Sequence, residues 1–559
     1  MGLLDAGNDD LYHRYIMDCA PYQGMPDETM NRRTYLKFAG GAAASAALAG
    51  CTGGDGNQDG TNTGDGGNGG GGGGGGQSGD FAVTITQGQM PSTLDPHNHR
   101  ETTTDNVVLQ AYEGLLSRNA EGKITNSLAT EYERVNDGTV QFTIRDDVQF
   151  HNGDDLTPED VAFSINRIVQ SDVGGLESPQ SDQLSGVTGA EVVDGNVQVS
   201  SDGINPIVFA LFASYCDIVQ QQWIENNNSS FIAKNMNGTG PFELQNYQED
   251  VRVVFQRNEN YWREPAAVSE LTFNSATESS TRVNQLINGE TDIVVNVPPQ
   301  DAERVRGSNS TRLAAKASTR VIYNAMRYNV EPFSSAQFRR AMNLAIDLPS
   351  IIDNVLSGFA DPTGQPTLDG FTGYNSNVNP YGTNRQEAER LVEESGHAGA
   401  NITLHTPVGR YLKDVEIAQA VSEQINQLGN VNCSVQQRDF NTLAGELSDG
   451  NLDTSPKFYL IGWGNATFDA SQTIIPLLTT DGALTSYSNE EVDTQMNEAQ
   501  NMPDGNERNS KLQEVNQLLH DQAPWIFLNR QYSVYGVSER LKWQARADER
   551  IEAYAISQN

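Results

Sequence analysis

The sequence predicts an α/β protein of two or three domains. Its 559 residues are too many for one hydrophobic core, because chains of this length divide into separate domains. Helix-like and strand-like apolar patterns alternate from about residue 81 to the C-terminus. Residues 402–435 have the strand–helix–strand order that joins two parallel strands, so at least one domain is expected to hold a partly parallel sheet.

One helix is predicted in the first part of this region and another near its middle. In Thr157-Pro158-Glu159-Asp160, the threonine caps a helix, the proline fits its first turn and the two acids face the positive end of the helix dipole. The stripe of Phe338, Ala341, Met342 and Ala345 predicts a second helix with one buried face.

The strand–helix–strand unit follows a further predicted helix. Thr383 and Gln386 have capping-box spacing, and Gly396 is expected to stop that helix. Ile402-Thr403-Leu404-His405 predicts a strand, and the apolar spacing of residues 418–428 predicts a helix that Gly429 ends. The run Val431 to Val435 predicts the second strand.

The charge balance is strongly acidic. The chain has 73 Asp and Glu against 36 Lys and Arg, a formal net charge of -37, and only eight of its basic residues are lysine. Scattered acidity of this size needs counterions to stay compact, and it is typical of proteins that fold in concentrated brine. We therefore infer a halophilic source and expect it to be archaeal. Nucleic-acid binding is excluded, because it needs a basic surface.

An N-terminal tract resembles a twin-arginine export signal that ends in a lipobox. Asn31-Arg32-Arg33-Thr34-Tyr35-Leu36-Lys37 is followed by an Ala/Gly-rich apolar run and by Leu48-Ala49-Gly50-Cys51. A charged region, a weakly apolar region and a small-residue cleavage site are typical of an export address. We expect residues 1–50 to be an extension and signal, Cys51 to carry lipid, and the protein to be anchored at the cell surface, on the outer face of the cytoplasmic membrane. Translation starts either at Met30 or at Met1.

Residues 51–80 are predicted to form a flexible tether. They are rich in Gly and Asp and include an unbroken glycine run from Gly69 to Gly76. Such a segment has nothing apolar to bury. No run of eighteen or more apolar residues occurs in the chain, so the sequence indicates anchoring without a membrane span.

Two cysteines and two histidines in the body of the chain carry little chemistry by themselves. Cys216 and Cys433 lie in apolar runs and are expected to be buried, either as free thiols or as a disulfide. His97 and His99 stand two residues apart in a predicted loop, which indicates surface polarity more than a metal pair. No metal site and no cofactor are predicted.

A series of motifs in a fixed order resembles the family 5 solute-binding proteins, the dipeptide-, oligopeptide- and nickel-type receptors of ABC importers. The resemblance covers essentially all of residues 81–559. Its main motifs are Leu94-Asp95-Pro96, Tyr112-Glu113-Gly114-Leu115, Val148-Gln149-Phe150-His151-Asn152-Gly153, Gly238-Thr239-Gly240-Pro241-Phe242, Tyr261-Trp262, Gly462-Trp463 and Ala523-Pro524-Trp525. The run Gly238-Thr239-Gly240-Pro241 is expected to be a turn where the chain crosses between lobes.

The resemblance implies a two-lobed periplasmic-binding-protein-like fold of class II, with a hinge and an extra inserted subdomain. Lobe I is expected to comprise residues 81–114, 207–316 and 530–559, with residues 115–206 as the inserted subdomain, and lobe II residues 317–529. The implied function is a monomeric, non-catalytic receptor that closes over one small solute and delivers it to ABC permease and ATPase subunits. By family default the solute is a peptide; an anionic, sugar-like or metal-chelate solute is the alternative.

The resemblance also places the cleft on particular residues. Peptide receptors of this family hold the free amine of the solute with an aspartate just after the Gly-Trp motif, and here Ala466 has that position, with Asp469 three residues further on. The segment after Leu94-Asp95-Pro96, where relatives have an acid, falls on Arg100 and its two successors. The predicted ligand-binding residues are Arg100, Glu101, Thr102, Arg410, Tyr411, Trp463, Asn465, Ala466 and Asp469.

Two interpretations of these residues stay open. In one, Arg100 and Arg410 face an anionic or polyhydroxylated solute, because a guanidinium favours carboxylate or phosphate, and Tyr411 and Trp463 provide aromatic surfaces. In the other, the two arginines form salt bridges between the lobes and Asp469 anchors an amine. A secreted hydrolase is a distant alternative, because no nucleophile-elbow, zinc-protease, Walker A or Cys-x-x-Cys motif occurs.

Overall fold

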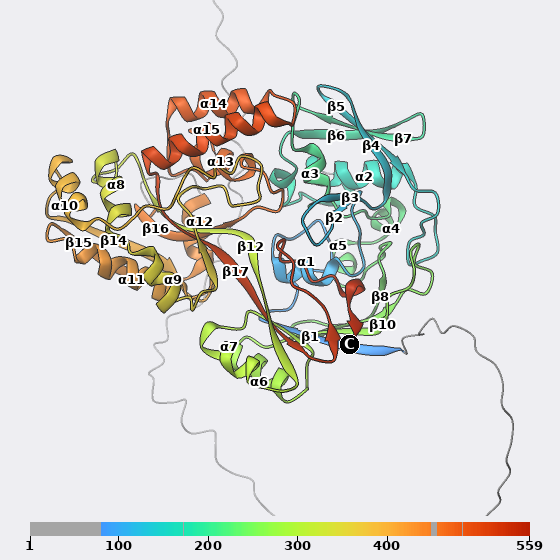
Figure 1. The fold of residues 1–559 in the computed structure, drawn as a ribbon. Coiled ribbons are helices and arrows are strands. Elements are labelled where there is room, and N and C mark those ends of the chain that lie inside the picture. The colour runs from blue at the N-terminus through green and yellow to red at the C-terminus, as the bar shows by residue number, and fades with distance from the viewer. Residues whose placement is uncertain (1–79, 172, 449–454, 483) are drawn as a thin grey trace, which may run out of the picture. The chain divides into compact units, whose positions relative to one another are not determined.

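A computed structural model describes residues 80–559, apart from residues 172, 449–454 and 483 (Figure 1). The predicted export signal, the lipidation site Cys51 and the glycine-rich tether lie outside the described residues. None of the helices in residues 80–559, as far as they are described, is both long and apolar enough to cross a membrane.

One large sheet runs through the protein. Within the described residues it has eleven strands in the order β15-β14-β16-β12-β17-β11-β1-β10-β9-β8, and β13 pairs with β17 beside this path. Its strands are β1 (Phe81–Gln87), β8 (Phe242–Gln248), β9 (Arg252–Arg257), β10 (Val268–Ser275), β11 (Ile293–Val295), β12 (Thr311–Met326), β13 (Ala360–Pro362), β14 (Ala400–Pro407), β15 (Val431–Arg438), β16 (Phe458–Gly464) and β17 (Trp525–Ser538).

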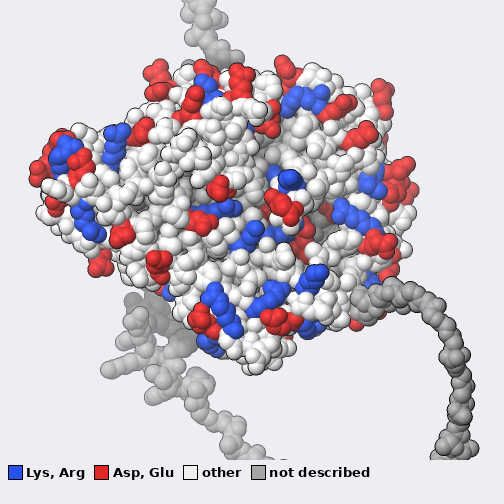
Figure 2. Space-filling model, viewed as in Figure 1, with Lys and Arg blue, Asp and Glu red and all other residues white. Residues whose placement is uncertain are grey.

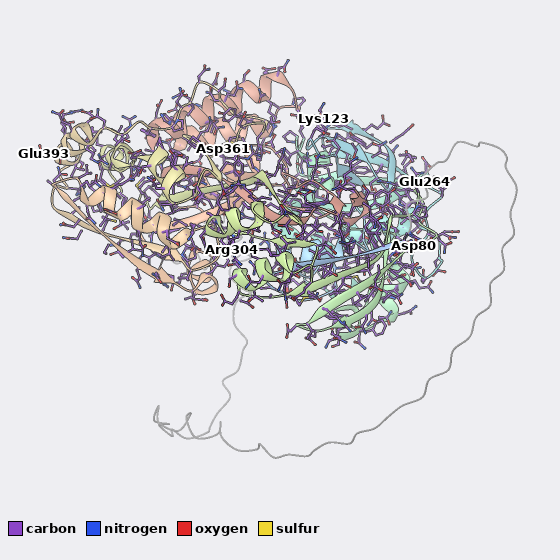
Figure 3. The ribbon with its side chains drawn as sticks, turned by 60° about the horizontal axis from the view of Figure 1, so that its bottom comes forward. Asp80, Lys123, Glu264, Arg304, Asp361 and Glu393 are labelled. Atoms are coloured by element: carbon purple, nitrogen blue, oxygen red, sulfur yellow. The ribbon has the colours of Figure 1, made fainter. Side chains whose placement is uncertain are left out.

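The sheet belongs to two lobes, which the long strands β12 and β17 connect (Figure 1). We call lobe I the part built on β1 and β8–β11, and lobe II the part built on β14–β16. The antiparallel pairing of β12 with β17 is interrupted between Ala317 and Val321, so the residues between them are free of that ladder. Arg530 of β17 donates hydrogen bonds to the carbonyls of Ala317 and Ser318 at this interruption. In Figure 3, Glu393 marks the outer helix α10 of lobe II and Glu264 lies at the opposite end, in lobe I.

The predicted strand–helix–strand unit is confirmed in lobe II. β14 pairs in parallel with β15 over its whole length, and α11 (Asp414–Asn426) connects them. Ile417, Ala418, Val421 and Ile425 of α11 are buried in the lobe II core together with Ile402 and Leu404 of β14. The α/β class predicted from the sequence is therefore confirmed.

The other helices surround these sheets. They are α1 (Thr102–Val108), α2 (Pro158–Val169), α3 (Val208–Phe212), α4 (Gln221–Asn226), α5 (Ser229–Ile232), α6 (Ser279–Ile287), α7 (Pro299–Arg306), α8 (Ala336–Ala345), α9 (Leu348–Asn354), α10 (Arg385–Glu394), α12 (Phe440–Ser448), α13 (Ser471–Leu478), α14 (Glu490–Gln500) and α15 (Asn506–Gln522). Thr157 and Asp160 form the predicted cap of α2, a capping box, and the predicted stripe on α8 is buried.

The cap predicted for α10 is wrong by one residue. Asn384, not Thr383, is the N-cap, and its side chain accepts a hydrogen bond from the Glu387 backbone N–H. The Thr383 hydroxyl instead donates to the carbonyl of Ile346. Asparagine is as good an N-cap as threonine, so the two adjacent residues could not be ranked from the sequence. Gly396 ends the helix as predicted, with φ of +79°.

A separate small sheet, in the order β4-β5-β7-β6, lies beside lobe I and packs against α2. Its strands are β4 (Ala129–Asn136), β5 (Thr139–Ile144), β6 (Val187–Val193) and β7 (Asn196–Ser201), and short strands β2 (Leu116–Arg118) and β3 (Ile124–Asn126) form a hairpin next to it. Two further short strands, β18 (Leu541–Lys542) and β19 (Ser557–Gln558), pair near the C-terminus. We call the β2–β7 region with α2 and α3 the small-sheet subdomain; its core includes Phe142, Ile165 and Phe212.

Three sequence expectations change or resolve here. Gly238 and Gly240 do not cross between lobes: a Cβ on Gly238 would lie 1.9 Å from the Ala111 carbonyl oxygen, so the glycines allow a close backbone contact inside lobe I. Cys216 and Cys433 are both buried free thiols in different cores, so the disulfide alternative is wrong.

His97 and His99 are not surface residues, because both are buried. The guanidinium of Arg167 on α2 binds Asp95 through two hydrogen bonds of 2.9 and 2.6 Å and also contacts His97 Nδ1 at 3.1 Å. His97 Nε2 lies 2.6 Å from the backbone carbonyl of Asp217. Burial, and then the nearby Arg167 charge, lower the pKa of His97 to about 4, so this histidine is part of a buried structural network.

Candidate functional site

Two loops of lobe II lie at one edge of its sheet. β14 and β16 are parallel neighbours, so their carboxyl ends meet at the same edge, which is where open α/β sheets bind ligands. The loop after β14 carries Arg410 and Tyr411, and the loop after β16 carries Asn465, Ala466 and Asp469. The Tyr411 hydroxyl donates a 3.1 Å hydrogen bond to the Gly462 carbonyl, which ties the first loop to β16.

The glycines of the Gly-Trp-Gly run leave one face of β16 bare. A Cβ on Gly462 would lie 2.8 Å from the Tyr411 ring, and a Cβ on Gly464 would lie 3.0 Å from the Arg320 guanidinium. Both side chains therefore rest on backbone where any other residue would displace them. Arg320 belongs to β12, next to its interruption.

Trp463 points to the other face of β16, since side chains alternate along a strand. Its indole N–H donates a 3.0 Å hydrogen bond to the carbonyl of Gln472 on α13, and its ring packs against the core that contains Leu368 and Ile474. The structure thus separates Trp463 from Tyr411, although the sequence grouped them.

Basic groups gather on the Tyr411 side. Arg320 forms an ion pair with Glu549 at 3.2 Å, and Arg410 stacks over the rings of Phe440 at 4.9 Å and Tyr411 at 5.5 Å. Among the described residues no carboxylate lies within ion-pair distance of the Arg410 guanidinium. In the view of Figure 2, Lys and Arg side chains, with Asp and Glu beside them, lie at the middle of the molecule, where Figure 1 places β12.

The electrostatics of the two arginines differ. Burial acts against the charge of Arg320, but Glu549 outweighs it and raises the pKa of that guanidinium. Burial lowers the pKa of Arg410, and the neighbouring charge of Arg320 lowers it further. The Asp414 carboxylate also lies at this loop, where it accepts hydrogen bonds from the backbone N–H groups of Arg410 and Tyr411. It forms no ion pair with the Arg410 guanidinium among the described residues, so an anionic group could still compensate that charge.

Asp469 is committed to a structural contact. Its carboxylate accepts hydrogen bonds from Arg508 at 2.7 and 2.8 Å and from the Ser471 backbone N–H at 3.0 Å. Arg508 is on α15 and its side chain is 0% exposed. Asn465 is buried as well; its amide donates to the Asp469 carbonyl and to the Thr473 hydroxyl. These contacts hold the loop after β16, and both Asp469 carboxylate oxygens bind the Arg508 guanidinium.

Ala466 lies where lobe II touches the small-sheet subdomain. Its carbonyl accepts a 2.8 Å hydrogen bond from the Ser214 hydroxyl. The Arg118 guanidinium donates to the Thr467 carbonyl at 2.9 Å and lies 4.8 Å from the centre of the Phe468 ring. Lobe II and the small-sheet subdomain therefore meet directly at this loop.

Arg100, Glu101 and Thr102 lie on the lobe I side, at the start of α1. Glu101 is exposed and accepts a 3.2 Å hydrogen bond from the Ser92 hydroxyl. Arg100 is exposed and is close enough to Tyr215 to influence its charge. The structure thus divides the predicted residues into three places: the start of α1, the Arg410 side of β16, and the buried or opposite side that holds Trp463, Asn465 and Asp469.

Sequence reasoning missed the C-terminal segment, residues 546–552. Arg546 pairs with Asp548 and with Glu552 at 3.0 Å, Glu549 pairs with Arg320, and Arg550 donates to the Ser214 carbonyl. This segment therefore contacts β12 and the small-sheet subdomain. Its only signal in the sequence is a dense run of both charge signs without helical or strand periodicity, a pattern that ordinarily indicates exposed surface.

The site has the character of a binding site. Within the described residues, no group of three or more His, Cys, Asp and Glu side chains could hold a metal ion. The polar groups present are guanidiniums, carboxylates, aromatic rings and backbone carbonyls, which suit recognition of a charged organic molecule.

Comparison with known proteins identifies relatives of one kind. The family model "Bacterial extracellular solute-binding proteins, family 5 Middle" matches residues 123–484, more than half of the chain. The glutathione-binding protein GsiB of Salmonella typhimurium is 23% identical over 458 residues, covering 79% of this chain and 88% of GsiB. The GsiB protein of Pectobacterium atrosepticum is 22% identical over 473 residues, covering 82% of this chain and 90% of the relative.

Solved structures with the same fold are binding proteins of transporters. The periplasmic binding protein DppA from Helicobacter pylori, in complex with the peptide STSA, superposes with a TM-score of 0.75 at 18% identity over 86% of this chain and 98% of DppA. The substrate-binding protein CtaP from Listeria monocytogenes gives a TM-score of 0.77 at 20% identity, over 86% of this chain and 99% of CtaP. The structure of NikA from Staphylococcus aureus with Ni(L-His)2 gives 0.72 at 18% identity, over 86% of this chain and 100% of NikA. These likenesses confirm the two-lobed fold.

Proposed function

Because the chain belongs to the family 5 extracellular solute-binding proteins, we propose that it is the non-catalytic receptor of an ABC importer. It captures one small solute between its lobes and delivers it to permease and ATPase subunits. Ligand binding then corresponds to closure about the interruption in β12 and β17. This proposal uses the domain boundaries expected from the sequence. They are residues 81–114, 207–316 and 530–559 for lobe I, 115–206 for the inserted subdomain and 317–529 for lobe II.

The solute carries an anionic group that lobe II holds. The observation that supports this choice is Arg410, a guanidinium without a carboxylate partner among the described residues, next to the Arg320–Glu549 pair and between two aromatic rings. A planar guanidinium binds carboxylate or phosphate through paired hydrogen bonds. The small residue at Ala466 and the commitment of Asp469 to Arg508 weigh against an ammonium anchor on the same lobe.

The proposed cellular location rests on the sequence motifs outside the described residues. A lipid on Cys51, attached after twin-arginine export, would hold the receptor on the outer face of the membrane. The flexible residues 51–80 would let it reach the permease as a monomer.

A thermal-shift screen tests the proposed solute class. Glutathione, for which the relative GsiB is named, short peptides, maltotriose and nickel–histidine are compared, and each acid is paired with its ester or carboxamide. A ligand at one hundred times its Kd adds about 2.7 kcal/mol to the free energy of unfolding. We expect acids to raise the melting temperature and their esters or amides to have little effect.

Arg410→Gln is the diagnostic variant. It should weaken binding of the acids roughly tenfold or more, the value of a charge-assisted hydrogen bond, without changing the melting temperature of the free protein. The matched control is Arg390→Gln on the outer helix α10. The Arg390 side chain is 51% exposed, and this variant should bind the acids normally. Binding that is equally strong for acid and amide, or unchanged in Arg410→Gln, would contradict the anionic assignment. If no class of compound binds, the receptor function itself is wrong.

A further inference from the structure

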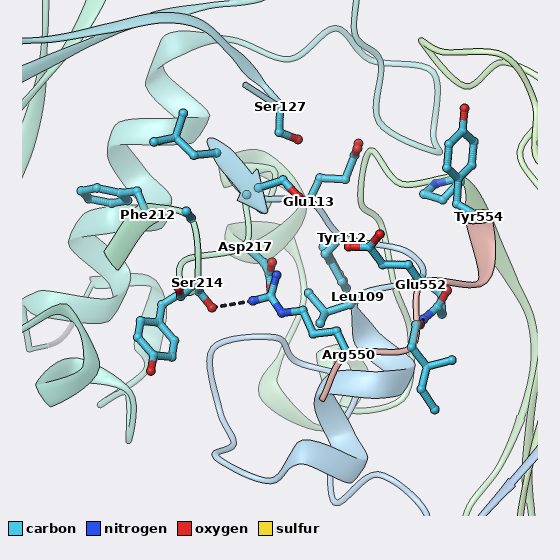
Figure 4. A pocket seen from close by; sticks show the side chains of 18 of the residues that line it. Leu109, Tyr112, Glu113, Ser127, Phe212, Ser214, Asp217, Arg550, Glu552 and Tyr554 are labelled. Carbon is cyan, nitrogen blue, oxygen red and sulfur yellow. Dashed lines mark hydrogen bonds between the residues drawn. The ribbon is translucent and has the colours of Figure 1, made fainter. Parts of the chain in front are cut away.

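A pocket of about 100 Å³ lies in lobe I, between the end of α1, the small-sheet subdomain and the C-terminal segment (Figure 4). It is small compared with the roughly 300–1,000 Å³ of sites that enclose a whole ligand, so it has room for one group of a larger solute. Its charged lining consists of Glu113, Asp217, Arg263, Arg550 and Glu552.

The three pocket carboxylates differ in how well they are satisfied. Glu113 accepts hydrogen bonds from Tyr261 at 2.7 Å, Trp262 at 2.9 Å and Thr239 at 3.0 Å, and Glu552 pairs with Arg546 at 3.0 Å. In the described part of the chain no group donates a hydrogen bond to the Asp217 carboxylate. Figure 4 shows Asp217 beside the Arg550 guanidinium, which donates its hydrogen bond to the Ser214 carbonyl instead.

Asp105 on α1 is a second carboxylate without a hydrogen-bond donor among the described residues. Its side chain is 44% exposed, and the nearest cationic candidate, His99 Nδ1, is 3.9 Å away, too far for a hydrogen bond. Both ring nitrogens of His99 are buried and without a hydrogen-bond partner. Asp105 interacts electrostatically with Arg550 and Asp217, so it lies next to the pocket.

The lobe I side is therefore short of positive charge. Among the described residues, Asp105 and the pocket carboxylates of Glu113, Asp217 and Glu552 have three arginines near them, Arg263, Arg546 and Arg550, and Arg546 is shared with a fifth carboxylate, Asp548. Burial raises the pKa of the three pocket acids, Glu113, Asp217 and Glu552, that of Asp217 to about 7. Such a surrounding binds a cation more readily than an anion, because a cation would stabilise the ionised carboxylates.

The pocket lies next to the contact between lobe II and the small-sheet subdomain. Tyr215 and Ser214 line it, and the Ser214 hydroxyl binds the Ala466 carbonyl of lobe II. The C-terminal segment links the acidic group on lobe I to the basic group on the other side, because Glu549 pairs with Arg320 and its neighbour Arg550 donates to the Ser214 carbonyl.

We infer that the solute is dipolar, with an ammonium or guanidinium group that docks beside Asp105 and Asp217 on lobe I and an anionic group on Arg410 of lobe II. The inference rests on the proposed receptor function and deepens it. In peptide receptors of this family the amine anchor is at the position of Ala466, on lobe II. Here the cationic group of the solute is held by lobe I instead. Asp105 and Asp217 are the residues that determine this specificity.

The test uses matched probes that share one carbon skeleton. Straight-chain ω-amino acids from β-alanine to aminooctanoate are compared by calorimetry with monocarboxylates and monoamines of the same length, at constant ionic strength. At one optimal length, the ω-amino acid should bind at least about tenfold more tightly than its matched monocarboxylate. That length reports the separation of the two subsites.

The variants Asp105→Asn and Asp217→Asn should remove this preference and leave monocarboxylate binding unchanged. Asp146→Asn, an exposed carboxylate of the small-sheet subdomain, is the matched control and should keep it. Melting temperatures of all variants verify that they are folded. If an amino group improves binding at no length, or if the control loses the preference equally, the inference is overturned. If monocarboxylates bind in an Arg410-dependent way and an added amino group gives no gain, the dipolar inference is overturned but the proposed receptor function is not.

Discussion

Removing the charge of Asp469 should destabilise the protein whether or not a solute is present. The carboxylate binds both terminal nitrogens of Arg508 at 2.7 and 2.8 Å, and that guanidinium is 0% exposed. In Asp469→Asn the buried cation loses its buried carboxylate and, among the described residues, keeps a 3.2 Å hydrogen bond to the Ser471 hydroxyl and a 3.5 Å contact with Asp504, whose side chain is 67% exposed. Breaking one partner of a buried pair costs about 3–5 kcal/mol, and we expect a loss of that size in the free energy of unfolding.

Urea denaturation of the solute-free protein measures this loss. Asp504→Asn removes the other carboxylate near the same arginine and is the matched control; because the Asp504 side chain is 67% exposed and its contact with Arg508 is 3.5 Å long, its cost should stay below about 1 kcal/mol. The double variant Asp469→Asn with Arg508→Gln should lose less than the sum of the single losses, since the two groups interact directly. If Asp469→Asn kept full stability but bound no solute, Asp469 would be a ligand anchor and the structural reasoning would be refuted.

Three further predictions concern pH, salt and processing. Burial raises the pKa of Asp217 to about 7, so the folded state binds this proton more tightly than the unfolded chain. The free energy of unfolding should therefore be highest in acid and decrease as pH rises through 7. Denaturation curves between pH 5 and 8 should show a smaller decrease for Asp217→Asn. With a net charge of -37, the protein should lose stability on dilution below roughly 1 M salt, and a melting temperature that is flat with KCl would contradict the halophilic interpretation. Mass spectrometry of the native protein should find a lipidated N-terminus at Cys51, whereas Arg32→Lys with Arg33→Lys should leave unprocessed precursor; an unmodified N-terminus upstream of Cys51 would refute the lipoprotein prediction.

The parts of the fold that the sequence predicted are those with local signals. The capping box of Thr157 and Asp160 and the parallel unit of β14, α11 and β15 depend on residues a few positions apart, so periodicity and turn chemistry were sufficient. Where two local signals compete, as at Thr383 and Asn384, the sequence offers no way to rank them. Tertiary contacts decide such cases, here the bond from Thr383 to Ile346.

Contacts between residues far apart in the sequence are what the sequence could not predict. His97 looked like a surface residue because its loop is polar, yet Arg167, seventy positions later, covers it. Asp469 lies three residues beyond the expected anchor position, Ala466, and the sequence did not show that it binds Arg508, 39 positions away. No spacing rule predicts either pairing, since each depends on how separate elements pack.

The charged residues of the C-terminal segment, residues 546–552, contact different parts of the protein, and the sequence alone could not show this. Arg546 donates to the Arg118 carbonyl of the small-sheet subdomain, Glu549 binds Arg320 on the connecting strand β12, and Arg550 binds the Ser214 carbonyl. A run of seven residues therefore contributes a carboxylate to the basic side of the site and a guanidinium to the acidic side. If the lobes move apart when the solute leaves, these contacts must rearrange together, because they share one short stretch of backbone. Solute charge and closure are then coupled through this segment, and the dipolar solute inferred above is the one that would match both sides at once.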